Sequence, residues 1–137
     1  MQPAPRELRY DGIHCHLVIE RLPNSVVLMK ITGTDVGEFG DAPMIALNGW
    51  MSTAAPVDFF VDAGDVRGAS IDVSGDWATW MGAHRGALKS VTMLTGSRFI
   101  RVTAEFVRRF ASLEGIMRIC TEPAVFERAL EDAVRAQ

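Results

Sequence analysis

The clearest structural pattern in the chain begins at Val91-Thr92-Met93-Leu94-Thr95-Gly96-Ser97 and runs to Phe126-Glu127-Arg128-Ala129-Leu130. A short β-branched run is followed by a Gly-Ser turn, an amphipathic stretch, a second short strand and a helix opened by Glu122-Pro123. This alternation of strand and helix is typical of an α/β layer with a largely parallel sheet. We therefore predict an α/β fold.

The sequence before this pattern predicts the rest of the same sheet. Two strand-like runs flank Leu22-Pro23-Asn24-Ser25, whose residues favour turns, so we expect an N-terminal β-hairpin. Val57-Asp58-Phe59-Phe60-Val61 is the strongest strand and is expected near the centre of the sheet. The whole pattern predicts a mixed, mostly parallel sheet of about five strands with four helices. The expected strands are 14–20, 26–32, 57–61, 91–94 and 117–120, the expected helices are 42–53, 75–88, 98–112 and 123–135, and a loop is expected over 62–72.

Composition limits the classes of function. The 137 residues are 48% hydrophobic and 23% charged, which suits one globular domain. We expect that domain over 13–137, after a flexible N-terminal tail over 1–12. The formal net charge of -3 argues against nucleic acid as a partner, since such domains are usually strongly basic. No apolar run approaches the roughly 20 residues of a spanning helix, and no secretion signal is recognisable. We therefore expect a cytoplasmic protein without membrane insertion, with Cys15 and Cys120 reduced.

Histidines are the first candidates for chemistry. His14 and His16 would lie on one face of a strand, about 6.5–7 Å apart. Two imidazoles need further ligands to hold Zn²⁺ or Cu²⁺, and no Cys-x-x-Cys or His-x-x-x-His pattern supplies them. We therefore expect no metal, and nothing in the sequence points to another cofactor.

His84 leaves an enzyme as an open alternative. It stands on a predicted apolar helical stripe beside Trp80 and Met81. A hydrolase-type enzyme could use it as a general base if Asp62 or Asp65 lay within hydrogen-bond reach.

The predicted helix over 98–112 has an apolar side and a basic side. Its apolar side is expected to face the core and consists of Phe99, Val102, Phe106 and Phe110. Its outer side would carry Arg101, Arg108 and Arg109, which suits an acidic partner surface. Free backbone N–H groups at the helix start could also receive an anion or a partner. The residues in reach of such a contact are Thr95, Gly96, Ser97, Arg98 and Arg101.

Four stretches of the sequence together resemble a known family. They are Val57-Asp58-Phe59-Phe60-Val61-Asp62, Asp72-Val73-Ser74-Gly75, Val91–Ser97 and Met117–Leu130, with its Pro-x-x-Phe-x-x-Ala-Leu ending. In this order and spacing they look like a STAS domain, the module of anti-sigma-factor antagonists and of the cytoplasmic tails of sulfate transporters. The chain is especially similar to the small stand-alone SpoIIAA-like proteins of bacteria.

The resemblance implies a regulatory protein without a catalytic centre. Its partner would be a protein such as a kinase or an anti-sigma-like regulator, with a homodimer as a further assembly. In the antagonists, a phosphorylated serine directly follows an aspartate before this helix, whereas Val73 follows Asp72 here and only Ser70 and Ser74 are nearby hydroxyls. The partner-binding residues that the resemblance implies are Asp62, Ser70, Asp72, Ser74 and Gly75.

The leading hypothesis is therefore a non-enzymatic STAS-type interaction module that binds a partner through the loop and helix start near residues 63–76. An alternative from another class is a sensor or carrier of a lipid, nucleotide or metabolite. Its pocket would lie between helices and sheet, lined by Met44, Trp77, Trp80 and Met81. The enzyme that uses His84 is the third hypothesis.

Overall fold

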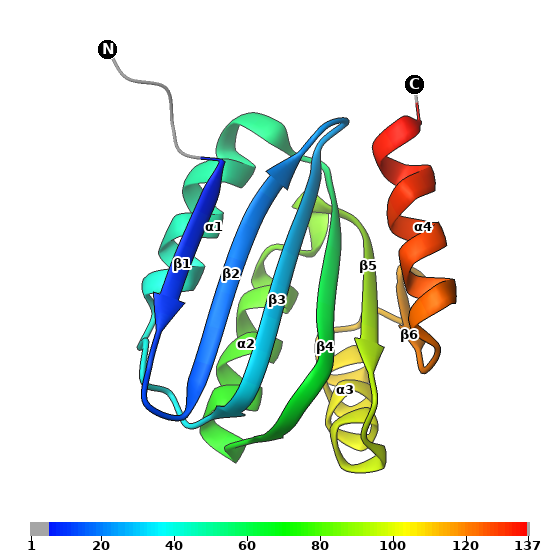
Figure 1. The fold of residues 1–137 in the computed structure, drawn as a ribbon. Helices are drawn as coiled ribbons and strands as arrows, with labels where there is room; N and C mark the ends of the chain where they lie inside the picture. The colour runs from blue at the N-terminus through cyan, green and yellow to red at the C-terminus, as the bar shows by residue number, and fades with distance from the viewer. Residues whose placement is uncertain (1–5, 137) are drawn as a thin grey trace.

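A six-stranded sheet with helices on both faces organises residues 6–136, which are the residues that the computed structural model describes (Figure 1). The strands follow one another across the sheet in chain order. The first three are antiparallel neighbours, and the third to sixth run parallel. The strands are β1 (Glu7–Asp11), β2 (Cys15–Leu22), β3 (Val26–Asp35), β4 (Val57–Ala69), β5 (Leu88–Thr95) and β6 (Met117–Cys120). The helices are α1 (Ala42–Ala54), α2 (Ile71–Ala83), α3 (Arg98–Phe110) and α4 (Pro123–Arg135).

The predicted α/β fold is confirmed, with its N-terminal hairpin, its mostly parallel sheet and its four helices. One strand more than expected is present, because Glu7–Asp11 of the predicted tail forms β1. Leu8 and Tyr10 pack against the core while Glu7 and Arg9 are exposed, which is the alternation of a strand with one buried face. Residues 1–5 of the predicted tail lie outside the described residues.

The predicted loop over 62–72 is wrong. Strand β4 continues to Ala69, and its buried residues Ala63 and Val66 keep contact with the core. Helix α2 begins at Ile71 because Ser70 caps it, its Oγ accepting the N–H of Val73 at 3.1 Å. The helix also ends earlier than expected, at Ala83, so that Leu88 belongs to β5 and not to the apolar stripe of α2.

Strand β4 is buried on both faces of the sheet. Phe59 packs into the layer of α1, α2 and α3, where its ring meets the edge of Trp80 at 6.1 Å between centroids. The next residue, Phe60, points to the opposite face and packs on Phe126 of α4 at 5.7 Å. Figure 1 shows α4 beside β5 and β6 on one face, while α1, α2 and α3 lie behind the sheet. The protein therefore has two apolar cores that share β4.

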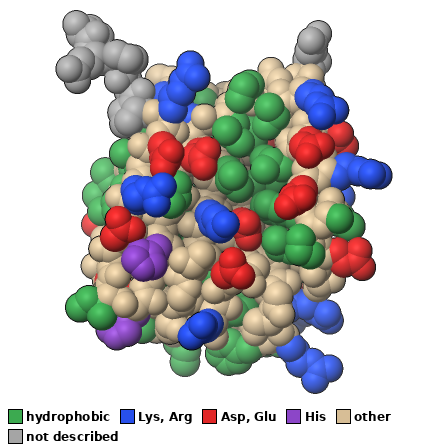
Figure 2. Space-filling view, viewed as in Figure 1, with side chains coloured by type: hydrophobic (Ala, Val, Ile, Leu, Met, Phe, Trp, Pro, Cys, Tyr) green, Lys and Arg blue, Asp and Glu red, His purple; other side chains and the backbone are tan. Residues whose placement is uncertain are grey.

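The face of the sheet that carries α4 is covered at Val26 of β3, which is buried in the α4 core, and is exposed farther along β3 at Lys30. Figure 2 shows basic and acidic side chains interspersed with hydrophobic ones on this face. Lys30 of β3 is exposed there and lies in register with Asp62 of β4. Mixed charges of this kind suit a solvated sheet face. Within residues 6–136, no helix combines the length and the apolarity needed to cross a bilayer.

Both cysteines are buried free thiols, Cys15 in β2 and Cys120 in β6. Burial raises the pKa of Cys15 to about 11, and the negative charges of Asp35 and Glu38 act in the same direction. The Cys15 thiol is therefore protonated at neutral pH and a poor nucleophile.

Helix α3 faces the core with a different side from the one predicted. Its buried residues are Ile100, Ala104 and Val107, together with Ala111 just beyond the helix. The predicted inward residues are exposed instead, and they are Phe99, Val102, Phe106 and Phe110. The reason is space: two small alanines let the helix lie close to the sheet, and the four larger side chains have no room beneath it.

This orientation of α3 can be checked by mutation. Ile100→Ala should lower the free energy of unfolding by about 2–4 kcal/mol, because it leaves a cavity under the helix. Phe106→Ala should change it by less than about 0.5 kcal/mol, as surface substitutions usually do. Urea denaturation of both variants measures the difference, and a larger loss for Phe106→Ala would show that the aromatic side is the buried one.

Glu38 ties the β1–β2 turn to the loop that follows β3. Its two carboxylate oxygens accept the backbone N–H groups of Ile13 at 2.7 Å and His14 at 2.9 Å. A Cβ added at Gly12 would lie 2.8 Å from this carboxylate, so a larger residue there would push the Glu38 side chain aside. Burial alone would raise the pKa of Glu38, but the hydrogen bonds from His14 and Ile13 outweigh it and the pKa is lowered.

The lowered pKa gives this clamp a pH dependence. The ionised carboxylate stabilises the fold above the ordinary carboxyl pKa, and that stabilisation is lost as the pH falls through the lowered pKa. We expect Glu38→Gln to melt at a lower temperature than the wild type at pH 7, and the difference to shrink toward pH 3. Thermal unfolding monitored by circular dichroism checks this, with exposed Glu114→Gln as the control. A difference that persists unchanged at low pH would contradict the clamp.

Candidate functional site

The parallel strands bring several chain segments to one edge of the sheet. Strands β3, β4 and β5 end there at Asp35, Ala69 and Thr95. The β1–β2 turn reaches the same edge, because Cys15 at the start of β2 pairs with Gly33 near the end of β3. The carboxyl edge of an open α/β sheet is where ligands commonly bind. In Figure 1 this edge is at the bottom of the molecule.

Four large apolar side chains are exposed along this edge. They are Ile13 (90% exposed), Val36 (49%), Ile71 (90%) and Phe99 (63%). We call these four residues the apolar edge. Ile13 lies in the β1–β2 turn, Val36 directly follows β3, and Ile71 and Phe99 lie in the first turns of α2 and α3. Single exposed hydrophobic residues are common, whereas several on one edge indicate an interaction surface.

Sequence reasoning missed the apolar edge. Ile13, Val36 and Ile71 are isolated residues in Gly-Ile-His, Asp-Val-Gly and Ser-Ile-Asp contexts, and none of them belongs to a repeating pattern. Phe99 belongs to the apolar side of α3 that was predicted to face the core, so its exposure was not expected. The one signal available is an isoleucine or valine between turn-forming residues, where no buried face is expected.

The start of α2 holds most of the residues that the resemblance implied. Ser70 caps the helix, and the Oγ of Ser74 donates a hydrogen bond to the Ser70 carbonyl oxygen at 3.0 Å. Asp72 is exposed in the first turn, and a Cβ added at Gly75 would meet nothing within 4 Å. Both serine hydroxyls are therefore engaged within the helix, and the surface that remains is formed by Ile71, Asp72 and Gly75.

Asp62 lies apart from these residues. Its carboxylate accepts the backbone N–H of Gly64 at 3.1 Å. In register with Lys30, it lies on the sheet face opposite to α2. Val73, which occupies the place of the phosphorylated serine in the resemblance, is buried.

The turn before α3 lies at the same edge as the start of α2. Thr95 is buried, and its Oγ1 donates to the Ser97 carbonyl oxygen at 3.1 Å, while Ser97 caps the helix by accepting the N–H of Ile100 at 3.4 Å. A Cβ added at Gly96 would lie 2.9 Å from the Gly64 carbonyl oxygen, so this turn depends on glycine. Since its hydroxyls are engaged, the exposed groups left for a partner are Arg98 and Arg101.

An apolar cavity of about 90 Å³ lies between α2, α3 and the sheet. Trp77 and Met81 line it, as the small-molecule hypothesis expected, and its few polar neighbours are Asp35, Ser74 and Thr103. Trp80 does not line it, because its indole N–H donates to Asn48 Oδ1 at 2.8 Å and its ring packs on Phe59. Met44 lines a separate cavity of about 70 Å³ with Trp77.

The histidines are engaged at separate places. His84 stacks on Trp80 at 4.6 Å, and its Nδ1 lies 2.8 Å from the Trp80 carbonyl oxygen. His84 lies at the end of α2, on the side of the sheet that α1, α2 and α3 cover, while Asp62 faces the side that carries α4. Asp65 is exposed and lines a shallow surface with His14 rather than with His84.

His14 and His16 do not share a strand face. His14 lies in the β1–β2 turn, 3.6 Å from Glu38, and His16 lies on β2, 2.9 Å from Asp11. Across residues 6–136, no three His, Cys, Asp or Glu side chains come together as they would around a metal ion.

Comparison with known proteins supports the fold. No protein-family model matches the chain, and no curated protein matches its sequence. A solved structure from Shewanella loihica PV-4, an uncharacterized protein of the DUF3478 family with a SpoIIAA-like fold, is similar to it with a TM-score of 0.63 and 15% sequence identity. The match covers 88% of this chain and 98% of the other. The chain therefore has a SpoIIAA-like α/β fold, consistent with the resemblance to STAS domains found in its sequence.

Proposed function

We propose that this protein is a non-enzymatic regulatory module that binds a partner protein through the apolar edge. The observation that carries the proposal is the exposure of Ile13, Val36, Ile71 and Phe99 at the carboxyl edge of the sheet. A fully exposed isoleucine gains from being buried by a partner, by roughly 1.5–3 kcal/mol for a side chain of this size. The SpoIIAA-like fold supports the proposal at the level of the scaffold.

Polar groups around the apolar edge would fix the orientation of the partner. Asp72 flanks Ile71, and Arg98 and Arg101 flank Phe99. A central apolar cluster with a polar rim is the usual composition of a protein interface. Ser70 caps α2 and the Ser74 hydroxyl donates to the Ser70 carbonyl oxygen, so the proposed docking surface uses neither hydroxyl.

Affinity capture with surface variants tests the proposal. The tagged protein should recover specific partners from a bacterial lysate, and Ile71→Asp or Phe99→Asp should lower their recovery by about tenfold, which corresponds to about 1.4 kcal/mol. Ile45→Asp is the matched control, because Ile45 is 60% exposed but lies on α1 and is not one of the four residues of the apolar edge. Equal recovery by all three variants would rule out the apolar edge as the docking surface.

A second candidate function rests on the cavity between α2, α3 and the sheet. Its apolar lining suits a small apolar ligand, although about 90 Å³ is less than the 150 Å³ or so of an engineered cavity that holds benzene. A larger ligand would therefore need α2 and α3 to move apart.

The melting temperature, measured with and without an apolar ligand, tests whether the cavity binds small molecules. Toluene and decanoic acid at saturating concentrations should raise the melting temperature of the wild type if the cavity binds them. Ala104→Leu should remove the effect, because Ala104 lines the cavity and a leucine would occupy it. An unchanged melting temperature of the wild type would exclude both ligands.

A further inference from the structure

We propose that the two cavities beside α2 together bind a small primary alkylammonium ion, with its charged head at Asp35 and its alkyl chain between α2, α3 and the sheet. We call the cavity of about 90 Å³ the tail cavity and the one of about 70 Å³ the head cavity. The proposal rests on the second candidate function, the cavity that binds a small molecule, and adds the chemical class of the ligand. It does not depend on the apolar edge.

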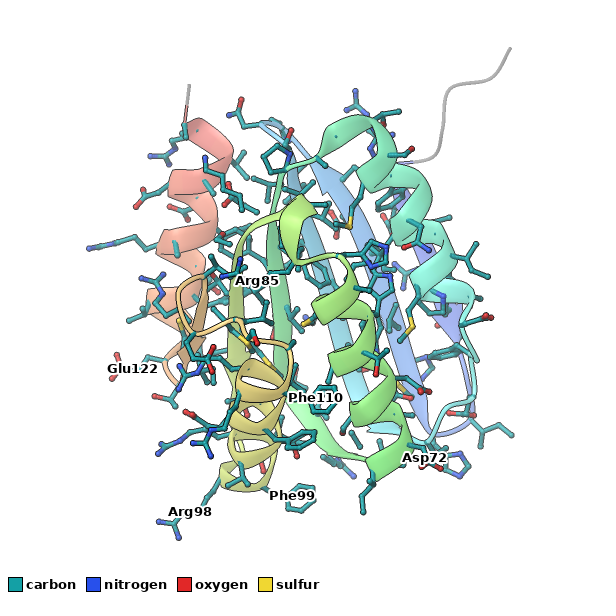
Figure 3. All side chains as sticks on the ribbon, turned by 180° about the vertical axis from the view of Figure 1, so that it is seen from behind. Asp72, Arg85, Arg98, Phe99, Phe110 and Glu122 are labelled. Atoms are coloured by element: carbon teal, nitrogen blue, oxygen red, sulfur yellow. The ribbon has the colours of Figure 1, made fainter. Side chains whose placement is uncertain are left out.

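The head cavity and the tail cavity adjoin each other. Asp35, Val73 and Trp77 line both of them. The loop between β3 and α1, residues 36–41, begins here beside the start of α2, because the N–H of Ser70 donates to the Asp35 carbonyl oxygen at 2.9 Å. Figure 3 looks onto these helices and shows α2 between α1 and α3. A ligand whose head lies at Asp35 can therefore extend its chain into the tail cavity.

Asp35 is a buried carboxylate with one oxygen left for a ligand. The residue is only 7% exposed, and its Oδ1 accepts the N–H of Gly37 at 3.0 Å. Among the described residues, its Oδ2 has no hydrogen-bond partner and no basic side chain forms a salt bridge with it. No unpaired side-chain oxygen is fully enclosed in that part of the chain, so Oδ2 borders open space in the cavities. Buried charges are usually paired, and a bound cation would supply the missing partner.

The lining of the head cavity favours a positive charge. It contains two carboxylates, Asp35 and Asp76, and no Lys, Arg or His. It also contains the aromatic rings of Phe39 and Trp77, and aromatic rings attract cations. A metal ion would need further ligands, because no group of three His, Cys, Asp or Glu side chains is found in the described part of the chain. These groups therefore select an organic cation.

The tail cavity limits the rest of the ligand. Its volume of about 90 Å³, against the 150 Å³ or so of an engineered cavity that holds benzene, suits a chain of about four carbons. Its polar lining residues besides Asp35 are already engaged, since Ser74 donates to the Ser70 carbonyl oxygen at 3.0 Å and Thr103 to the Phe99 carbonyl oxygen at 3.3 Å. A second charge at the far end of the ligand would be left unpaired. The site therefore suits a monoamine and excludes a diamine.

Three ligands with one alkyl chain and different heads test the site. They are n-pentylamine, 1-pentanol and pentanoate, and titrations followed by ¹H–¹⁵N NMR at pH 7 measure their affinities, with the Trp77 indole N–H as one probe. n-Pentylamine should bind the wild type at least about tenfold more tightly than 1-pentanol, because hydrogen bonds between charged groups are the strongest ones. Pentanoate should bind most weakly, because Asp35 and Asp76 repel its charge.

Asp35→Asn is the decisive variant, because it retains an oxygen to accept the Gly37 N–H and removes the negative charge. It should lower the affinity for n-pentylamine by about tenfold and leave that for 1-pentanol unchanged. Asp76→Asn, at an exposed position that tolerates the change, should weaken amine binding about threefold, as the loss of an exposed ion pair does. Asp72→Asn is the matched control and should bind like the wild type, because exposed Asp72 lines neither cavity.

Two results would overturn the ammonium site. One is n-pentylamine that binds no more tightly than 1-pentanol, or equally well to Asp35→Asn, which would leave Asp35 with its turn hydrogen bond alone. The other is unchanged amine binding by Ala104→Leu, because the chain would then lie outside the tail cavity. If toluene raises the melting temperature while the amine shows no preference, the apolar cavity stands and the ammonium site is excluded. If neither ligand binds, the second candidate function fails as well.

Discussion

The structure depends on the burial of β4 on both faces of the sheet. Adjacent residues of a strand point to opposite faces, so Phe59 and Phe60 can both be buried only if each face is covered. Trp80 of α2 covers the first ring, and Phe126 of α4 covers the second. The crossover helices α1, α2 and α3 cover one face, and α4 after the last strand covers the other. Because each crossover returns the chain to the same end of the sheet, strands β3 to β6 are parallel. Because these strands are parallel, their carboxyl ends lie at the same edge of the sheet, and the residues of the apolar edge follow those ends.

Helix α3 shows how packing in the core produces a surface that could bind a partner. The helix is apolar on two sides, and the sheet can cover only one of them. The side with Ile100, Ala104 and Val107 fits closely on the sheet, so the bulky side with Phe99 and Phe106 is left outside. The exposed aromatic side is thus a consequence of choosing small residues for the core contact, and the arginines beside it help to keep such a helix soluble.

Much of the fold is readable from the sequence, and the misplaced elements share a physical cause. The strand 117–120 and the helix 123–135 have clear periods and clear boundaries, and the structure has them at those residues. Helix α2 starts before its predicted residue because Ser70 caps it. The prediction placed the start later because the first turn, Ile71-Asp72-Val73-Ser74, has little helix propensity and contains other residues that could cap a helix. Helix α3 has two apolar sides with helical periodicity, one with Ile100, Ala104 and Val107 and one with the phenylalanines. The limited space over the sheet determines that the side with the smaller residues is buried. Three members of the apolar edge, Ile13, Val36 and Ile71, are single residues that no periodicity can reveal, and Phe99 was assigned to the core-facing side of α3.

The start of α2 bears on how a SpoIIAA-like protein of this kind would be controlled. Phosphate on Ser70 would remove the cap that holds Val73 in place, and Ser74 would have to leave its bond to the Ser70 carbonyl. Either change works against the helix start that presents Ile71. Val73 itself is buried beside the cavity, where a charged group would be costly. Both hydroxyls thus take part in the local structure that exposes Ile71, and a phosphate on either one would disturb it.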